Sequence, residues 1–451
     1  MQKNDVLTLN VEGFGAEAEG VCRHDGRVIF VPGALPGEQI TALIVKTLKS
    51  HAFGKLLDVL LPSPMRIQPP CPYYAKCGGC SCQHMSYKAE LEFKRGYIQE
   101  AMDRIGGLDI QVPPVSGMAD PWHYRNKTSL PVASQGGVPV SGFYMRRSHQ
   151  IIPTQACLIA KPQSDAAGTV VTQWMRAYDI APYDEESHTG LVRHIMTRVS
   201  RQGEVMVVLV INGQEVTRSW ELADMLQASL PALASLCVSP NTKRGNTIMG
   251  STYKVLWGKE RLEDTLCGFS FELSPLSFFQ INTDQAERLY LQALNLAVPK
   301  PDDLVFDLYC GAGTISTLFS AQCREVIGIE IIAQTVQDAQ QNALRNGISN
   351  LRFLQGAAEQ LMPQLVAQGQ RPDIVVLDPP RKGAQEAVLQ AICDAAPRSV
   401  VYVSCHPGTQ ARDAQFLCRH GYTLSACSPY DMFCHTADVE NILLFTRGEA
   451  S

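Results

Sequence analysis

The chain has 451 residues, of which 45% are hydrophobic and 18% charged, a composition that excludes a disordered protein and predicts about three globular domains. Its net charge of -5 excludes a globally basic nucleic-acid-binding protein and leaves room for a local basic region. No apolar run reaches the roughly 18 residues of a membrane helix, and the start of the chain has no apolar core like that of a signal peptide. We therefore expect a soluble, cytoplasmic monomer with no membrane partner.

Residues 1–61 predict a small β-barrel of the OB type. Short alternating runs at 27–31, 39–45 and 54–60 are separated by glycine and proline turns. Five prolines between residues 62 and 72 then predict a stiff connector and a domain boundary.

Residues 62–267 predict a mixed central domain, with a helix near 85–105 and many strand-like runs; part of 85–110 is expected to pack on the domain that follows. Between residues 66 and 150 there are ten Lys and Arg but six Asp and Glu, interleaved with aromatic residues such as Trp122 and Tyr124. This mixture neutralises phosphates and stacks bases, so it favours RNA binding, although a core with a basic rim has the same composition. Arg125 and Lys127 are the candidate RNA contacts.

A cluster of cysteines opens the central region. Cys71, Cys77 and Cys80 are separated by five and two residues, which puts three sulfurs within reach of one centre. The fourth ligand is either Cys82, nearby, or Cys157, far along the chain. Because the paired C-x2-C motifs of a zinc ribbon are missing, an iron-sulfur cluster competes well with zinc.

Residues 268–451 predict an α/β domain with a doubly wound parallel sheet. Strand-like runs at 304–308, 325–329, 351–353, 374–377 and 400–403 alternate with helical stretches, and such sheets bind ligands at the carboxyl ends of their strands. Gly311 and Gly313 follow the first strand, and Glu330 ends the second, where it can accept hydrogen bonds from ribose hydroxyls. Ser316 stands where a dinucleotide-binding site has its third glycine, so the binding of a pyrophosphate is disfavoured. The pattern favours S-adenosylmethionine, which has no phosphate.

Two strand-end motifs carry the predicted chemistry. Asp378 begins an Asp-Pro-Pro-Arg loop directly after a strand, and Arg381 takes the place where adenine amino-methyltransferases have an aromatic residue. Cys405 follows the next strand, so its thiol lies at the cofactor's edge of the sheet. A thiolate that adds to C6 of a pyrimidine makes C5 nucleophilic, and a base must later remove the C5 proton. Glu440 is the candidate base.

Taken together, these motifs resemble the RNA 5-methyluridine methyltransferase family, and among its members the 23S ribosomal RNA enzymes with a TRAM domain and a 4Fe-4S cluster. The resemblance covers nearly the whole chain, including the segment from Trp122 to Lys127 and the Phe-Phe-Gln-Ile-Asn run around Gln280. It implies methylation of ribosomal RNA, with transfer RNA as a weaker alternative. It also implies the roles of individual residues: Cys405 as nucleophile and Glu440 as base; Gln280, Tyr309, Gly311, Gly313, Glu330 and Asp378 for S-adenosylmethionine; Cys71, Cys77, Cys80 and Cys157 for the cluster; and Trp122, Tyr124, Arg125 and Lys127 for RNA.

Three positions depart from the family pattern, and two rival functions stay open. The family often has Asn at His406, His at Asp438 and a polar residue at Ala357. An RNA 5-methylcytosine methyltransferase would use the same addition chemistry, but it usually carries a second cysteine where Arg381 stands. A non-catalytic RNA-binding protein would fit the barrel and the basic region but not the residues at the strand ends.

Overall fold

A closed five-stranded barrel forms the N-terminal unit of the computed structural model, which describes residues 1–448. Alternate side chains of its strands point inward: in the first strand Leu9 and Val11 are buried while their neighbours are more exposed. The predicted small β-barrel is therefore confirmed. In barrel order the strands are β1 (Val6–Phe14), β2 (Gly20–His24), β3 (Arg27–Val31), β5 (His51–Leu61) and β4 (Gln39–Thr47).

The central unit is a seven-stranded mixed sheet whose apolar side chains pack against two helices, α2 (Pro162–Ala177) and α3 (Ser219–Ser229). Its middle strands β9 and β10 are buried at every residue; β10 is accordingly a continuous apolar run, whereas β9 buries Arg193, His194 and Arg198 as well. In sheet order the strands are β12 (Lys254–Gly258), β11 (Leu233–Pro240), β10 (Val205–Ile211), β9 (Val192–Val199), β6 (Lys127–Gln135), β7 (Val138–Tyr144) and β8 (Ile151–Pro153).

A short hairpin, β13 (Leu262–Leu266) and β14 (Phe269–Leu273), follows the central sheet. Its two turn residues, Cys267 and Gly268, both have positive φ, at 52° and 82°. That is the pattern of a tight turn whose twist matches that of the flanking strands.

The C-terminal unit is the doubly wound α/β domain that the sequence predicts. Five neighbouring strands are parallel, and two antiparallel strands, β21 and β20, complete one edge. In sheet order the strands are β17 (Leu351–Gln355), β16 (Glu325–Glu330), β15 (Leu304–Leu308), β18 (Ile374–Leu377), β19 (Ser399–Ser404), β21 (Glu440–Arg447) and β20 (Tyr422–Tyr430). The helices are α4 (Thr283–Ala297), α5 (Thr314–Ser320), α6 (Ala333–Arg345), α7 (Ala358–Ala367), α8 (Glu386–Ala395) and α9 (Pro407–Arg419).

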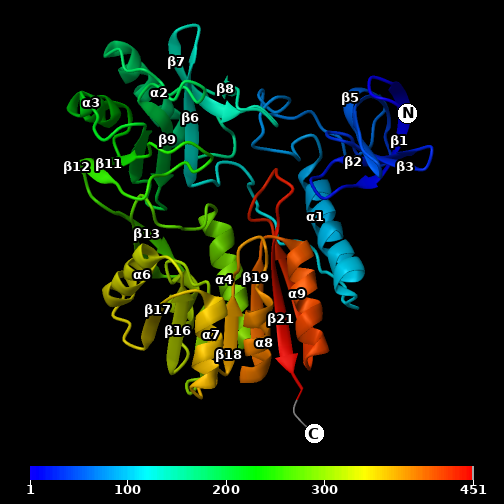
Figure 1. The fold of residues 1–451 in the computed structure, drawn as a ribbon, viewed down its shortest axis with the longest axis vertical. Coiled ribbons are helices and arrows are strands. Elements are labelled where there is room, and N and C mark those ends of the chain that lie inside the picture. The colour runs from blue at the N-terminus through cyan, green and yellow to red at the C-terminus, as the bar shows by residue number, and fades with distance from the viewer. Residues whose placement is uncertain (449–451) are drawn as a thin grey trace.

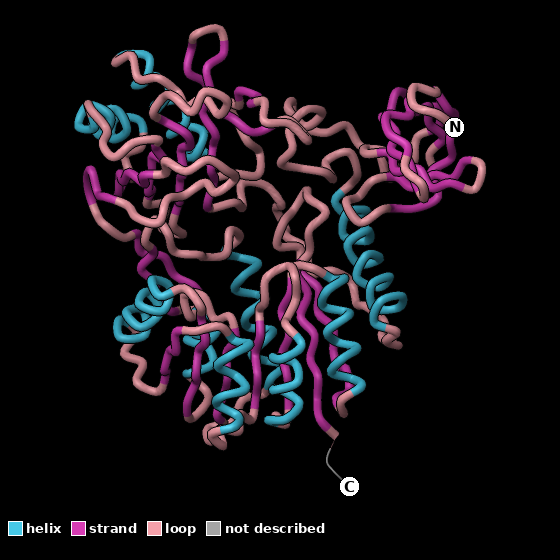
Figure 2. The backbone as a smooth tube through the Cα atoms, in the orientation of Figure 1, coloured by secondary structure: helices cyan, strands magenta, loops and turns pink. Residues whose placement is uncertain are grey.

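Helix α1 (Tyr87–Ala101) joins the upper part of the molecule to the C-terminal sheet. Ser86 caps it, and its last turn continues into a wider π-helical turn, η1 (Met102–Gly106). Ile98 and Met102 are buried in the same apolar cluster as Leu417 of α9, and Figure 1 shows α1 running beside α9. The barrel and the central unit both lie above the carboxyl ends of the parallel strands, where loops gather (Figure 2). Among residues 1–448, no helix combines the length and the apolar character needed to cross a membrane.

Candidate active site

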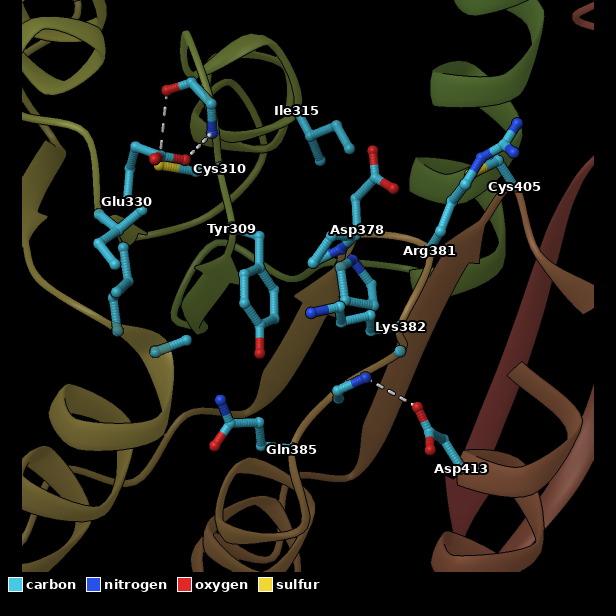
Figure 3. Close-up of a pocket in the computed structure, with 18 of the residues that line it drawn as sticks. Tyr309, Cys310, Ile315, Glu330, Asp378, Arg381, Lys382, Gln385, Cys405 and Asp413 are labelled. Atoms are coloured by element: carbon cyan, nitrogen blue, oxygen red, sulfur yellow. Dashed lines mark hydrogen bonds between the residues drawn. The ribbon is translucent and has the colours of Figure 1, made fainter. Parts of the chain in front are cut away.

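A cavity of about 1480 Å³ opens at the carboxyl ends of the parallel strands in the C-terminal sheet. The sheet order reverses between β15 and β18, and this reversal leaves a crevice outside the strand ends. The loops after β15, β16, β18 and β19 line the cavity together with the start of β21 (Figure 3). The site therefore lies where the sequence pattern predicts a ligand.

The loop after β15 has the shape that close approach to a ligand requires. Glu330, at the end of β16, accepts hydrogen bonds from the backbone N–H of Gly311 at 3.2 Å and of Ile332 at 2.9 Å (Figure 3). Gly313 has φ +76°, and a Cβ atom there would lie 2.5 Å from Phe353. A side chain at this position would meet both backbone strain and a clash, so the glycine is required.

Beneath this loop lies Ser316, at the position where a dinucleotide-binding site has its third glycine. Its hydroxyl donates a hydrogen bond to Asp307, whose pKa burial raises to about 7 despite that bond. On the other wall, the buried Tyr290 lies beside Gln280 and Thr314, and all three line the cavity. Tyr290 escaped the sequence reasoning because it lies inside a helix with ordinary amphipathic spacing.

The antiparallel strand β21 brings the predicted nucleophile and base together. Cys405 follows β19 directly, and Ser404 pairs with Asn441 across the two strands. Since β21 runs opposite to β19, its first residue, Glu440, lies at the carboxyl end of β19, and both side chains line the same cavity. Asp378 lines that cavity from the end of the adjacent β18.

Burial changes the acidity of all three groups. It raises the pKa of Asp378 to about 7. Burial, and after it the negative charges of Asp378 and Asp438, raises the pKa of Glu440 well above its usual value. Burial, and then the carboxylates of Glu440 and Asp378, raises the pKa of the Cys405 thiol to about 12. Glu440 Oε2 has no hydrogen-bond partner within the described chain, so this oxygen is free to accept a proton.

The departures from the family pattern now have definite places. His406 is the N-cap of α9, where its Nδ1 accepts the backbone N–H of Thr409 at 3.2 Å, a capping role that an Asn side chain can also fill. Ala357 is the N-cap of α7 and lines the cavity without a side-chain bond to the helix. Asp438 forms an ion pair with Arg381 at 2.8 Å.

The predicted RNA-binding segment lies on the central unit, and its aromatic residues contact the protein itself. Tyr124 is 5% exposed, and its hydroxyl donates to the carbonyl of Cys434 at 3.0 Å. Trp122 stacks on His435 with the ring centroids 3.8 Å apart. Lys127 has its pKa lowered to about 7, first by burial and then by neighbouring guanidinium groups. Contact of these residues with RNA stays a prediction.

Sequence reasoning missed the network that holds residues 431–439, which we call the base loop because it leads into Glu440. The fully buried Lys94 of α1 donates to Asp431 Oδ1 at 2.5 Å, to Glu90 Oε1 at 2.7 Å and to the carbonyl of Phe433 at 3.2 Å. The carbonyl of His435 accepts the backbone N–H groups of residues 81 and 82, at 2.9 and 3.0 Å. The signal that could have pointed to this network is the pair Glu90 and Lys94, four residues apart on the same face of α1 as Ala89, Phe93 and Ile98.

Four of the cysteines gather beside the base loop. Burial, and then the thiols of Cys157, Cys77 and Cys71, raises the pKa of Cys80 to about 12. The backbone N–H of Gly79 donates to Cys77 Sγ at 3.4 Å, as N–H groups do toward sulfur ligands. Thiolates are the ligand type that an iron-sulfur cluster uses. Within residues 1–448, however, no three His, Cys, Asp or Glu side chains lie close enough together to hold a metal ion, so the expected 4Fe-4S cluster is not shown.

The comparisons with known proteins agree with this geometry. The model of the tRNA (uracil-5-)-methyltransferase family matches residues 86–448, and that of the TRAM domain matches residues 2–57. An uncharacterized RNA methyltransferase of Clostridium tetani is 41% identical over 99% of this chain and 97% of its own length. Another, from Halalkalibacterium halodurans, is 41% identical over 98% of this chain and 97% of its own length.

A solved structure shows the same fold. It is the tRNA (uracil-54, C5)-methyltransferase of Pyrococcus abyssi in complex with S-adenosyl-L-homocysteine, with a TM-score of 0.80 over 98% of this chain and all of that one, at 22% identity. From these matches the family follows: the chain belongs to the tRNA (uracil-5-)-methyltransferase family.

Proposed function

We propose that this protein transfers a methyl group from S-adenosylmethionine to C5 of a uridine in RNA. One observation carries the proposal: Cys405 and Glu440, from adjacent antiparallel strands, line a single cavity together with the glycine loop after β15. A nucleophile and a base on one side of a cofactor crevice are what methylation at C5 needs.

The chemistry proceeds in three steps. The Cys405 thiolate adds to C6 of uracil, so that an S–C6 bond forms and the electrons of the C5–C6 double bond move onto the C4 carbonyl as an enolate. C5 then takes the methyl group, which the bound cofactor supplies, leaving S-adenosylhomocysteine. Finally the Glu440 carboxylate removes the C5 proton, the double bond re-forms, and the thiolate is expelled. Asp378, with its pKa near 7, can hold the polar edge of the uracil in its protonated form.

We propose that the cofactor is held by residues on three walls of the cavity. The loop after β15 lines the cavity and leaves space for the ligand. The Glu330 carboxylate, which accepts the backbone N–H of Gly311, would accept hydrogen bonds from the ribose hydroxyls when the cofactor binds. The proposed set is Gln280, Tyr309, Gly311, Gly313, Glu330 and Asp378.

We propose 23S ribosomal RNA as the substrate, because the chain combines the barrel with the cysteine set that the resemblance associates with ribosomal RNA enzymes. Transfer RNA is the second candidate, favoured by the description of the matching family. In either case the target uridine must leave its stack to enter the cavity, and Phe278, at the cavity wall and 61% exposed, is placed to stack on it.

A covalent trap tests the chemistry and the substrate together. The protein is incubated with S-adenosylmethionine and RNA that contains 5-fluorouridine, whose fluorine cannot leave as a proton does, and is then run on a denaturing gel. We expect a stable protein–RNA band with ribosomal RNA fragments for the wild type and for Cys393→Ala, a half-buried cysteine outside the cavity, but none for Cys405→Ala. A band on transfer RNA alone would keep the chemistry and move the substrate. If no band forms on either RNA, the proposed chemistry is wrong.

We propose that Cys71, Cys77, Cys80 and Cys157 hold a 4Fe-4S cluster that supports the structure around the base loop. The proposal is supported by their mutual proximity and by the burial of Cys82 in a separate apolar cluster. Methyl transfer moves no net electrons, so the cluster would supply structural support and no redox step. Iron and sulfide content measured on anaerobically purified protein tests it: near-stoichiometric cluster in the wild type and in Cys82→Ala, with loss in Cys80→Ala, is expected.

We propose that the chain divides into domains at 1–61, 62–267 and 268–451, the last three residues lying outside the described part.

We further propose that Arg125 and Lys127 bind the RNA backbone. The guanidinium groups of Arg198 and Arg125 lie close enough to Lys127 to help lower its pKa, and a group of three cations attracts phosphate. A double Arg125→Ala, Lys127→Ala variant is expected to bind RNA more weakly and with a smaller salt dependence. Unchanged affinity and salt slope would contradict it.

A further inference from the structure

The surroundings of Cys405, at the ends of β19 and β21, disfavour its reactive thiolate form. Burial and the carboxylates of Glu440, Asp378 and Asp438 all favour the neutral thiol of Cys405, with a pKa of about 12. These effects outweigh the opposing positive charge of Arg381, so the thiol of the free enzyme is mostly neutral at pH 7. Addition to C6 needs the thiolate, so some group must offset these negative charges.

Arg381 is the cation placed to do so. Its positive charge acts on the Cys405 thiol, and Figure 3 shows the side chain extending along Asp378 toward Cys405. Three other cations line the cavity, Lys382, Arg412 and Arg419, and Arg412 is engaged with Asp413 at 2.6 Å. None of the three is among the main charges that act on the thiol.

The backbone of the Arg381 loop is tied to the helix that begins beside Cys405. Thr409, in the first turn of α9, donates its hydroxyl to the carbonyl of Arg381 at 3.1 Å. Asp413, one turn later, accepts the backbone N–H of Ala384 at 2.8 Å (Figure 3). These bonds hold the loop at a constant position relative to Cys405, whichever way the Arg381 side chain turns.

Asp438 directs the side chain itself. Its carboxylate pairs with the Arg381 guanidinium at 2.8 Å, although both side chains are partly exposed, at 42% and 64%. A guanidinium has several N–H groups in one plane, so it can bond a carboxylate and a thiolate at the same time, which a lysine cannot do with the same geometry. RNA in the cavity would displace water from this exposed pair, and the attraction between guanidinium and thiolate strengthens as water leaves.

We propose that Arg381 is a catalytic residue that stabilises the Cys405 thiolate before it adds to uracil, and that Asp438 is the positioning residue that aims Arg381. The thiol proton passes to water, and the S–C6 bond forms from the lone pair left on sulfur. The inference rests on the proposed function for its biological meaning, but the state of the thiol can be measured without any RNA.

The test is the pH dependence of Cys405 alkylation by iodoacetamide in the free enzyme, followed by mass spectrometry of the Cys405 peptide because the chain has 15 cysteines. For Arg381→Gln we expect alkylation at a given pH below the midpoint to slow at least tenfold, while Arg381→Lys keeps part of the rate. Lys382→Gln, which removes the same charge from the same loop, is expected to leave the alkylation midpoint in place. Thermal unfolding and S-adenosylhomocysteine binding report that each variant is folded.

Two outcomes overturn the proposal. If Arg381→Gln alkylates like the wild type and only its affinity for RNA falls, then Arg381 is a phosphate contact. If Asp438→Asn shifts the midpoint equally in the wild-type and Arg381→Gln backgrounds, then Asp438 acts by its own charge and does not position Arg381. Because alkylation needs neither substrate nor cofactor, a failure of methyl transfer on every RNA would refute the proposed function and leave this measurement readable.

Discussion

Lys94 is the side chain whose loss should most clearly separate catalysis from cofactor binding. Burial alone would lower its pKa, but Asp431 and Glu90 outweigh burial and raise it above its usual value, so the ammonium stays charged inside the protein. Lys94→Met removes that charge and leaves two carboxylates buried. Breaking a buried ion pair from one side costs about 3–5 kcal/mol. The cost falls on the base loop, since Asp431 and the carbonyl of Phe433 belong to it.

Hydrogen exchange measured by mass spectrometry gives the assay. Since about 1.4 kcal/mol corresponds to a tenfold change, amides of residues 431–439 should exchange roughly a hundredfold to a few thousandfold faster in Lys94→Met, while the barrel amides of residues 6–61 stay unchanged. We expect kcat to fall because Glu440 follows the loosened loop, and the KM for S-adenosylmethionine to hold because the loops after β15 and β16 are untouched.

Two controls decide the reasoning. Arg95→Met, on the same helix, breaks an exposed pair with Glu92 at 3.0 Å and should change the exchange by less than about threefold, as expected for about 0.5 kcal/mol or less. A triple variant that adds Glu90→Gln and Asp431→Asn to Lys94→Met should recover part of the protection, because no charge is then left unpaired. A base loop in Lys94→Met that exchanges within fivefold of the wild type would refute the argument.

Three further predictions concern the cofactor loop, the RNA contact and the cysteines. Gly313→Ala should abolish S-adenosylmethionine binding in calorimetry, since a Cβ would lie 2.5 Å from Phe353 at φ +76°; binding within threefold of wild type would contradict it. RNA affinity should fall as pH rises through about 7, because Lys127, with its pKa lowered to about 7, must take up a proton to bind phosphate, and Lys127→Arg should remove that pH dependence; the same slope in both proteins would count against the contact. Cys157→Ser should lose bound iron while Cys82→Ser keeps it, as elemental analysis can show, and the reverse result would exchange their roles.

The sequence by itself determined the elements and the chemistry at their ends. Strand burial has a period of two residues or shows as an apolar run, and helix burial follows a wider period, so the barrel and the strands at 304–308 and 374–377 could be placed from local pattern alone. The same strands located Asp378 and Cys405, because a motif directly after a parallel strand must lie at its carboxyl end. Glycines at 311 and 313 likewise marked a turn, and at Gly313 both the positive φ and the side chain of Phe353 disfavour any other residue.

Only the tertiary structure decided how distant segments meet. The antiparallel direction of β21 places Glu440 beside Cys405, and nothing local in the sequence states that direction. Lys94 pairs with Asp431, and Tyr124 is buried against Cys434, through contacts between residues more than 300 positions apart. The pKa of Glu440 is raised because several elements together exclude water from its carboxyl group. Desolvation and long-range pairing are properties of the packed chain, so local periodicity reveals which residues can do the chemistry, while packing sets their charge and their partners.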